Sequence, residues 1–513
     1  MTRNYLDILA ETIRNNWDAP ALTDFYLTED GSSQDTSRGN HYTYGEMYAE
    51  ICRVANLLTS IGLQKGDHIA ICGANSAHWV IAYLAIAKMQ GVSVTVMHSL
   101  MPDEIARLVD FSDAKALFAD EDIWSELKNQ SLPQVGNVIS LENWQILRGE
   151  NIQTSNHKLQ ITNSDCGFPK TAPDDLAMIC FTSGTSGKIK GVMLSYGAIS
   201  ATSMSLDRLF PVGENKKNLS IFPLAHMYGL LGDVLSQLNM GSHISFTRAL
   251  NLANIVRLVQ MVKPFQILLV PALLGDLTKD KNFELVNSMP SFLRYALVGG
   301  AVVDELQITK LRKAKCPLTV GYGMTETASL ISVVRPNEYR AHACGKVVPT
   351  LTARISPAGE ILVKGENVML GYYKDPEATA RKIDSDGWLH TGDKGHLDED
   401  GYLYVEGRLE QDIIVLPNGE NIRPDNIESL INALPEVSES IVLARDGKLV
   451  AIVVPDSQMS NHKLQITNTD LRRMIMRKVN PSLPLFSQLY DVEITDLPLA
   501  RTEKKTLKRY LYK

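Results

Sequence analysis

The stretch HIAICGANSAHWVIAYLAIAKMQGVSVTVM, His68–Met97, predicts a strand, a helix and a second strand in succession. HIAICG at its start and VSVTVM at its end are short, mostly apolar runs, which is typical of strands buried in a sheet. Between them, AHWVIAYLAIAKMQG has the length of a helix and ends at Gly91. Units of this kind build parallel sheets, so the stretch predicts an α/β fold.

The same alternation continues on both sides of His68–Met97. Helix-then-strand patterns recur at residues 103–120 and 254–271, so we expect doubly wound, mainly parallel sheets with helices on both faces. Near the end of this region, short alternating strands around Gly turns predict a small barrel-like subdomain at about 340–407. We therefore expect a large N-terminal domain at residues 1–407 and a small α+β C-terminal domain at 408–513.

Composition and charge exclude several classes of protein. The chain has 513 residues and a net charge of −7 without a long basic run, so we expect no nucleic-acid partner. Its six cysteines form no C-x-x-C pair, which fits a reducing compartment. The N-terminus lacks the apolar core of a signal peptide and no apolar stretch is long enough for a membrane span, so we expect a cytoplasmic protein. The segment SNHKLQITN occurs at Ser155–Asn163 and again at Ser460–Asn468, and we assign it no function.

The loop FTSGTSGKIKGVML, Phe181–Leu194, combines the features of a phosphate-binding loop. Gly184 and Gly187 would let the backbone approach an anion closely, and Lys190 adds positive charge. Hydroxyl donors come from Thr182, Ser183, Thr185 and Ser186. The spacing is not that of a Walker loop, and by itself the segment is equally compatible with a polar turn after a buried strand.

Four further motifs follow the loop in order: YALVGGAVV, GYGMTETA, GWLHTGDKGHLDEDGYLYVEGR and NGENIRPDNIE. Together the five motifs resemble the adenylate-forming superfamily, most closely its fatty acyl-CoA synthetases, and the resemblance covers most of the chain. It implies an enzyme that uses ATP and Mg²⁺: a carboxylate attacks the α-phosphorus, pyrophosphate leaves, and the acyl-adenylate then passes its acyl group to coenzyme A. The loop would hold the departing β- and γ-phosphates.

The resemblance also implies roles for individual residues. Tyr322 would stack on adenine, Asp393 would bind the ribose, and Arg408 would reach the ribose or a phosphate. Glu326 and Thr182 would hold Mg²⁺, a cation that prefers oxygen ligands. The implied ATP- or AMP-binding residues are Thr182, Ser183, Gly184, Thr185, Ser186, Gly187, Lys190, Gly299, Gly300, Ala301, Tyr322, Gly323, Met324, Thr325, Asp393 and Arg408. Taken singly, Tyr322 also fits a core aromatic and Glu326 a carboxylate at a helix start.

His226 and Gly323 correspond to positions that the family places beside the acyl substrate. His226 is equally compatible with a structural histidine at a helix start. LAHMYG, residues 224–229, contains no acid that could pair with an ammonium group. We therefore expect an apolar acyl group, that of a medium- or long-chain fatty acid.

The C-terminal tail RTEKKTLKRYLYK departs from the family signature Thr-x-x-Gly-Lys-x-x-x-Arg. We take Lys505 as the lysine that serves adenylation, beside Glu326 and Thr182 as catalytic residues, with Lys504 and Lys508 as alternatives. An exposed basic helix face would explain the same lysines. Glu410 falls at the family's hinge position, which implies that the C-terminal domain is mobile. Two other readings stay open: transfer of the acyl group to an acyl carrier protein, and a nucleotide- or acyl-binding homologue without catalysis.

The substitution Lys505→Ala tests the assignment in the tail. If the Lys505 ammonium neutralises charge at the α-phosphorus, its removal slows adenylate formation about 10²-fold or more in a single turnover. Adenylate formation at the wild-type rate would move the role to Lys504 or Lys508.

Overall fold

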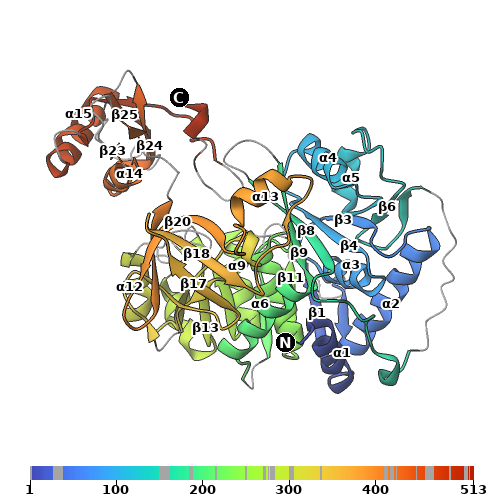
Figure 1. Cartoon of the computed structure of the whole chain (residues 1–513). Coiled ribbons are helices and arrows are strands. Elements are labelled where there is room, and N and C mark those ends of the chain that lie inside the picture. The colour runs from blue at the N-terminus through green and yellow to red at the C-terminus, as the bar shows by residue number, and fades with distance from the viewer. Residues whose placement is uncertain are drawn as a thin grey trace. The chain divides into compact units, whose positions relative to one another are not determined.

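The structure is a computed structural model of the chain (Figure 1). It describes all residues except 1–2, 27–38, 150–160, 184–188, 214–215, 249–250, 270–272, 275–276, 278–282, 300–304, 336–337, 409–413, 416–420, 423, 446–447, 457–466, 484–486, 502–506, 508 and 513. The chain divides into two compact units, Met1–Glu406 and Gly407–Lys513. Most of both copies of SNHKLQITN lies outside the described residues.

The predicted strand–helix–strand unit forms β3 (His68–Cys72), α3 (Ala77–Lys88) and β4 (Val92–Val96). The Ser76 side chain begins α3 by accepting a hydrogen bond from the Trp79 N–H. β3 and β4 pair in parallel, and every residue of α3 before Lys88 is buried. A helix that is apolar on all sides belongs inside a protein, where both of its faces meet packed neighbours. The prediction of an α/β fold is confirmed.

An eight-stranded sheet surrounds this unit, in the order β19-β9-β8-β4-β3-β5-β6-β7. Its other strands are β5 (Ala116–Ala119), β6 (Asn137–Ser140), β7 (Ile146–Arg148), β8 (Leu176–Ser183), β9 (Ile189–Ser195) and β19 (Gly371–Tyr372). Successive residues of β3 face opposite sides: Ile69 packs in one core with α2 (Tyr44–Ser60) and α3, and Ala70 packs with α4 (Pro102–Phe111) and α5 (Glu121–Leu127). Helices therefore cover both faces (Figure 1).

A second sheet has thirteen strands, and its strand pairing changes from mainly parallel to antiparallel across the sheet. One part is parallel apart from its edge strand β2 (His41–Thr43): β1 (Pro20–Phe25), β11 (His243–Thr247), β10 (Lys217–Ser220), β12 (Gln266–Leu269), β13 (Tyr295–Val298) and β14 (Leu318–Tyr322). The other part is antiparallel where its strands pair: β15 (Ser332–Val333), β16 (Ala343–Val347), β21 (Tyr402–Arg408), β20 (Leu389–Leu397), β18 (Glu360–Gly365) and β17 (Leu351–Ile355). The β-rich segment thus continues the parallel sheet.

One core joins the two sheets. Ile71 and Phe118 of the eight-stranded sheet share a buried cluster with Phe246 and Leu268 of the thirteen-stranded sheet and with helices between them. The remaining helices of the first unit are α1 (Tyr5–Asn15), α6 (Tyr196–Leu209), α7 (Met227–Gly229), a π-helical turn (Leu230–Leu235), α8 (Ser236–Asn239), α9 (Leu252–Val262), α11 (Phe283–Ser288), α12 (Glu305–Lys313) and α13 (Pro376–Lys382). In the described part of the chain, no helix is both long and apolar enough to cross a membrane.

The second unit has its own small sheet and core. Its elements are β22 (Ile414–Val415), β23 (Asn421–Ile422), α14 (Pro424–Asn432), β24 (Val437–Arg445), β25 (Lys448–Pro455), α15 (Asn468–Val479) and β26 (Asp491–Ile494). β24 and β25 form an antiparallel hairpin, and β26 pairs in parallel with β25. Helices α14 and α15 pack on this sheet through Ile427, Ile431 and Ile475.

Two ion pairs attach the C-terminal tail to this unit. Arg501 pairs with Glu439, and Arg509 pairs with Glu428. The backbones of Arg501 and Leu507 form an antiparallel bridge, so residues 502–506 connect two anchored positions. Lys504, Lys505 and Lys508 lie outside the described residues.

All six cysteines lie in the described residues, and none forms a disulfide. Burial raises the pKa of the Cys166 and Cys344 thiols to about 11 and that of Cys316 to about 12. Burial also raises the pKa of Cys52 and Cys72. At neutral pH these five side chains are therefore protonated thiols.

The Arg509–Glu428 pair makes a stability prediction. Only 12% of the Arg509 side chain and 8% of the Glu428 side chain are exposed, so Glu428→Gln leaves a buried positive charge without its partner. We expect the second unit to lose about 3 kcal/mol of stability, measured by hydrogen exchange of the β24 and β25 amides in the full chain. The exposed pair Arg445–Glu493 is the control: Glu493→Gln should change the same free energy by less than about 1 kcal/mol. Equal losses in the two variants would contradict the prediction.

Candidate active site

Two neighbouring parallel strands end beside each other at the predicted nucleotide site. β13 ends at Val298 and β14 at Tyr322, and Gly299 and Gly323 follow them directly. A side-chain carbon on Gly323 would lie 2.0 Å from the Ser329 carbonyl oxygen, so only glycine fits there. In open α/β sheets, ligands bind at the carboxyl ends of the strands. Gly300 and Ala301 lie outside the described residues.

The structure brings together Tyr322 and Asp393, the residues predicted for adenine and ribose. The Tyr322 hydroxyl donates a hydrogen bond of 2.6 Å to Asp393 Oδ2. Asp393 lies on β20, is only 6% exposed, and its backbone N–H donates to the Thr391 hydroxyl at 3.0 Å. The hydrogen bond therefore fixes the tyrosine ring to the strand that carries the carboxylate.

The predicted magnesium carboxylate is held by a tyrosine. Glu326 lies in the single turn Thr325–Thr327, which follows Met324, and it is buried like Thr325. The Tyr372 hydroxyl donates to Glu326 Oε1 at 2.7 Å, and the Met369 N–H donates to the Glu326 carbonyl at 2.9 Å. Within the described residues, Glu326 Oε2 accepts no hydrogen bond. A carboxylate oxygen held in this way fits a Mg²⁺ ligand.

The phosphate loop is described only at its two ends. Thr182 lies opposite Lys190, and Ser183 lies opposite Ile189, in the hairpin of β8 and β9. Gly184, Thr185, Ser186 and Gly187 lie outside the described residues. The Lys190 ammonium is 5.2 Å from the centre of the Tyr372 ring. Tyr372 thus contacts both the predicted phosphate-binding lysine and the predicted magnesium carboxylate.

His226 begins a helix, as one of its two predicted roles requires. It precedes α7, and its Nδ1 accepts a hydrogen bond of 3.1 Å from the Tyr228 N–H. Its ring meets the ring of Phe222 edge to face at 5.2 Å. The Tyr228 hydroxyl donates to the Leu297 carbonyl on β13 at 3.0 Å, so this helix start packs against the strand ends of the site.

Two predicted residues lie at the division between the units. Arg408 is the last residue of β21, and its side chain is not among those described. Glu410 lies outside the described residues. The predicted roles of these residues stay predictions.

The structure adds Asp233, which sequence reasoning missed. LAHMYG contains no acid, and Asp233 lies in the segment that follows it, LLGDVL at residues 230–235. It is fully buried in the π-helical turn. A single acid within an apolar run is the sequence signal that could have found it, because a buried carboxylate requires a specific environment.

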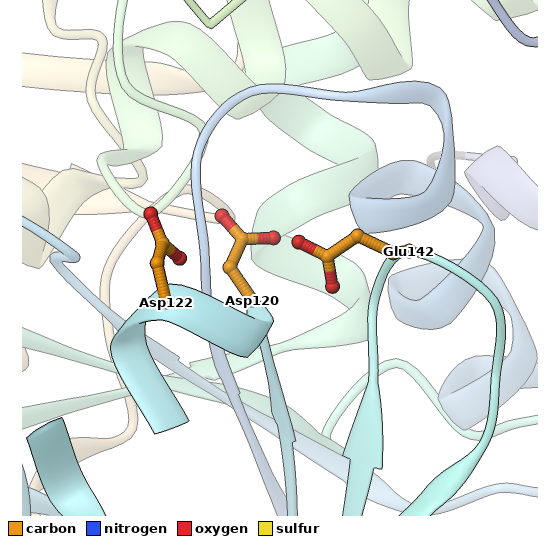
Figure 2. A group of neighbouring side chains, drawn as sticks. All are labelled: Asp120, Asp122 and Glu142. Carbon is orange, nitrogen blue, oxygen red and sulfur yellow. The ribbon is translucent and has the colours of Figure 1, made fainter. Parts of the chain in front are cut away.

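A second acidic group lies elsewhere in the first unit. Figure 2 shows Asp120 and Asp122 at the start of α5, and Glu142 after β6, directed toward one another. Arg248 donates to Asp120 Oδ1 at 2.9 Å and to Glu142 Oε1 at 3.1 Å, and the Ala74 N–H donates to Asp120 Oδ2 at 2.7 Å. Burial raises the pKa of the Asp120 carboxyl to about 6, although Arg248 opposes the shift. Because Arg248 already supplies the counter-charge, we assign no metal here.

Comparisons with known proteins cover both units. The family model described as AMP-binding enzyme matches residues 9–373, and the one described as AMP-binding enzyme C-terminal domain matches residues 411–512. 4-coumarate--CoA ligase 3 of Arabidopsis thaliana is 29% identical over 502 residues, which cover 93% of this chain and 87% of that protein.

Two solved structures share the fold. The o-succinylbenzoate CoA synthetase of Bacillus subtilis, in complex with its acyl-adenylate intermediate, has a TM-score of 0.80 and 24% identity, covering 99% of this chain and 98% of its own. ATP-bound MatB from Rhodopseudomonas palustris has a TM-score of 0.77 and 24% identity, with the same two coverages.

The Tyr372–Glu326 hydrogen bond generates a prediction about Mg²⁺. In Tyr372→Phe the Glu326 carboxylate loses the group that orients it, so the Mg²⁺ concentration for half-maximal ATP–pyrophosphate exchange should rise about 10-fold. Tyr373→Phe is the control, because its hydroxyl donates to Asp113 at 2.7 Å instead. If the Mg²⁺ requirement of Tyr372→Phe is unchanged, Tyr372 does not orient the Mg²⁺-binding carboxylate.

Proposed function

We propose that this chain, which belongs to the AMP-binding enzyme family, activates a carboxylic acid with ATP and passes the acyl group to coenzyme A. A carboxylate oxygen of the acid forms a bond to the α-phosphorus, the bond from that phosphorus to pyrophosphate breaks, and acyl-AMP remains. The coenzyme A sulfur then bonds to the acyl carbon, its proton passes to solvent, and AMP leaves. The observation that carries the proposal is the hydrogen bond between Tyr322 and Asp393.

The chain's own residues would divide the work of the first step. Tyr322 would offer the face of its ring to adenine while its hydroxyl stays bound to Asp393, the residue proposed to bind the ribose. Lys190 and the loop from Thr182 would hold the phosphates that leave. Glu326 and Thr182 would hold Mg²⁺, which supplies positive charge to the phosphates when it is bound.

The second unit would supply the remaining charge. Lys505 is proposed to neutralise the α-phosphate during adenylation, and Glu410 to lie at the hinge between domains 1–407 and 408–513. The division of the chain after Glu406 and the start of the second family match at residue 411 support this boundary. A cytoplasmic location stays a prediction.

Two classes of acid are candidates for the substrate. Sequence analysis predicted a medium- or long-chain fatty acid, and that stays a prediction. The relatives reported above are named for 4-coumarate and o-succinylbenzoate, which makes aromatic acids the first class to test. Coenzyme A is the acceptor in those names, and transfer to an acyl carrier protein is the alternative that the assay must separate.

Acid-dependent exchange between ATP and pyrophosphate tests the proposed function. We expect exchange with at least one member of a panel of aromatic and fatty acids, and AMP and an acyl-CoA thioester once coenzyme A is added. Exchange without a thioester would favour an acyl carrier protein as the acceptor. The absence of AMP with every acid, or ADP as the product, would refute the proposal.

A substitution of Asp393, the residue proposed to bind the ribose, tests whether this activity depends on the site. Asp393→Asn removes a charged acceptor, so the KM for ATP should rise about 10-fold. Asp386→Asn, an exposed acid on the turn before β20, is the control and should keep the wild-type KM. If Asp393→Asn has the wild-type KM for ATP, Asp393 does not bind ATP.

A further inference from the structure

Asp233 carries a buried carboxyl group that no hydrogen bond of regular geometry satisfies within the described part of the chain. Its exposed fraction is 0%, and neither carboxylate oxygen makes such a hydrogen bond within the described residues. Burial raises the pKa of this carboxyl well above its usual value, and weak hydrogen-bond contacts from the Phe222 N–H, Asn218, Ser220 and the Ile221 N–H only partly oppose the shift. Burial therefore favours the neutral, protonated form of this carboxyl group.

The side chains around Asp233 are also incompletely bonded. Among the described residues, Asn218 Oδ1 and Ser220 Oγ are buried and make no hydrogen bond. Asn218 and Ser220 lie on β10, and the Asn218 amide donates to the Asp233 backbone carbonyl at 2.8 Å. Buried polar groups are normally bonded, so a group of this size points to a ligand or water that completes it.

The π-helical turn that contains Asp233 holds this residue against the sheet. The π-helical turn Leu230–Leu235 packs closely on β12, because a side-chain carbon on Gly232 would lie 2.7 Å from Leu268. Turns of this type insert a residue into a helix and are frequent at functional sites. The sequence thus places its one acid in this turn against the polar part of the sheet.

The polar group lies next to the predicted acyl site. Tyr228 belongs to the same helical segment as Asp233. Burial raises the pKa of the Tyr228 hydroxyl, and Asp233 is close enough to add to this increase. The Tyr228 ring is about 3.5 Å from the position that a side-chain carbon on Gly299 would take. Gly299 follows β13, and His226 begins the segment. Tyr228 therefore lies between the segment that carries Asp233 and the strand end at Gly299, where the acid is expected.

We propose that Asp233, with Ser220 beside it, is a specificity-determining residue that hydrogen-bonds a hydroxyl group at the far end of the acyl substrate. This inference rests on the proposed function. A neutral carboxyl both donates and accepts hydrogen bonds, and a hydroxyl group does the same, so the two are complementary. A plain alkyl or phenyl end would leave the polar group unsatisfied, which favours hydroxylated acids over their unsubstituted counterparts.

Matched pairs of acids test the proposal: para-hydroxycinnamate against cinnamate, and omega-hydroxydodecanoate against dodecanoate. In ATP–pyrophosphate exchange we expect kcat/KM to be about 10-fold or more higher for the hydroxylated member of at least one pair. Asp233→Leu should remove this preference by slowing the hydroxylated acid while the unsubstituted acid is retained or improved. Asp233→Asn, which keeps the shape and one acceptor, should show an intermediate preference.

Controls separate recognition from folding. Asp207→Asn changes a half-buried acid on α6, whose carboxyl pKa burial raises to about 8, and it should leave the preference unchanged. If thermal unfolding shows that Asp233→Leu does not fold, the preference for the hydroxylated acid is measured in Ser220→Ala and Asp233→Asn instead. No preference in the wild-type protein, or the same preference in the Asp233 and Ser220 variants, would overturn the proposal and assign the polar group to buried water.

Failure of the proposed function is distinguishable from failure of this inference. If no acid supports exchange, calorimetric binding of the same pairs to the full chain still compares hydroxylated with unsubstituted acids. Tighter binding of a hydroxylated acid that is lost in Asp233→Leu would support the inference alone. Equal or undetectable binding would overturn it as well.

Discussion

Two hydrogen bonds join the turn at Glu326 to the edge of the other sheet. The Met369 N–H donates to the Glu326 carbonyl, and the Tyr372 hydroxyl donates to its carboxylate. Glu326 follows β14 in the thirteen-stranded sheet, whereas Tyr372 belongs to β19 in the eight-stranded sheet. The distance between this carboxylate and the strands of the phosphate loop therefore depends on how the two sheets pack. The shared core fixes that packing, so the geometry of the site depends on residues remote from it.

Much of the fold could be predicted because its signals are local. The apolar runs of β3 and β4 and the helical length of α3 are visible within thirty residues of sequence. The roles at Tyr322 and Asp393 came from a family resemblance, and the sequence could not show that the two side chains touch, because 71 residues separate them. The Tyr372–Glu326 contact spans 46 residues and was not predicted for the same reason.

Asp233 was missed for a different physical reason. The local pattern predicts an apolar segment, and only the three-dimensional structure shows that its single acid meets polar side chains from β10. An unbonded buried polar group costs about 1–3 kcal/mol, a large part of the net stability of a typical domain. The extensive core of a chain of this size can offset such a cost. Recognition of a polar ligand would be a reason for the chain to keep a destabilising acid at this position.

The buried cysteines have a practical consequence for assays that follow the consumption of coenzyme A through its thiol group. Colorimetric reagents that react with sulfhydryl groups require the thiolate, and burial raises the thiol pKa of five of the six cysteines. Three of these five, Cys72, Cys166 and Cys316, are also buried from the reagent. The background absorbance from the protein itself would therefore be low. A falling signal in such an assay would report the disappearance of coenzyme A, which allows turnover to be followed continuously without radiolabel.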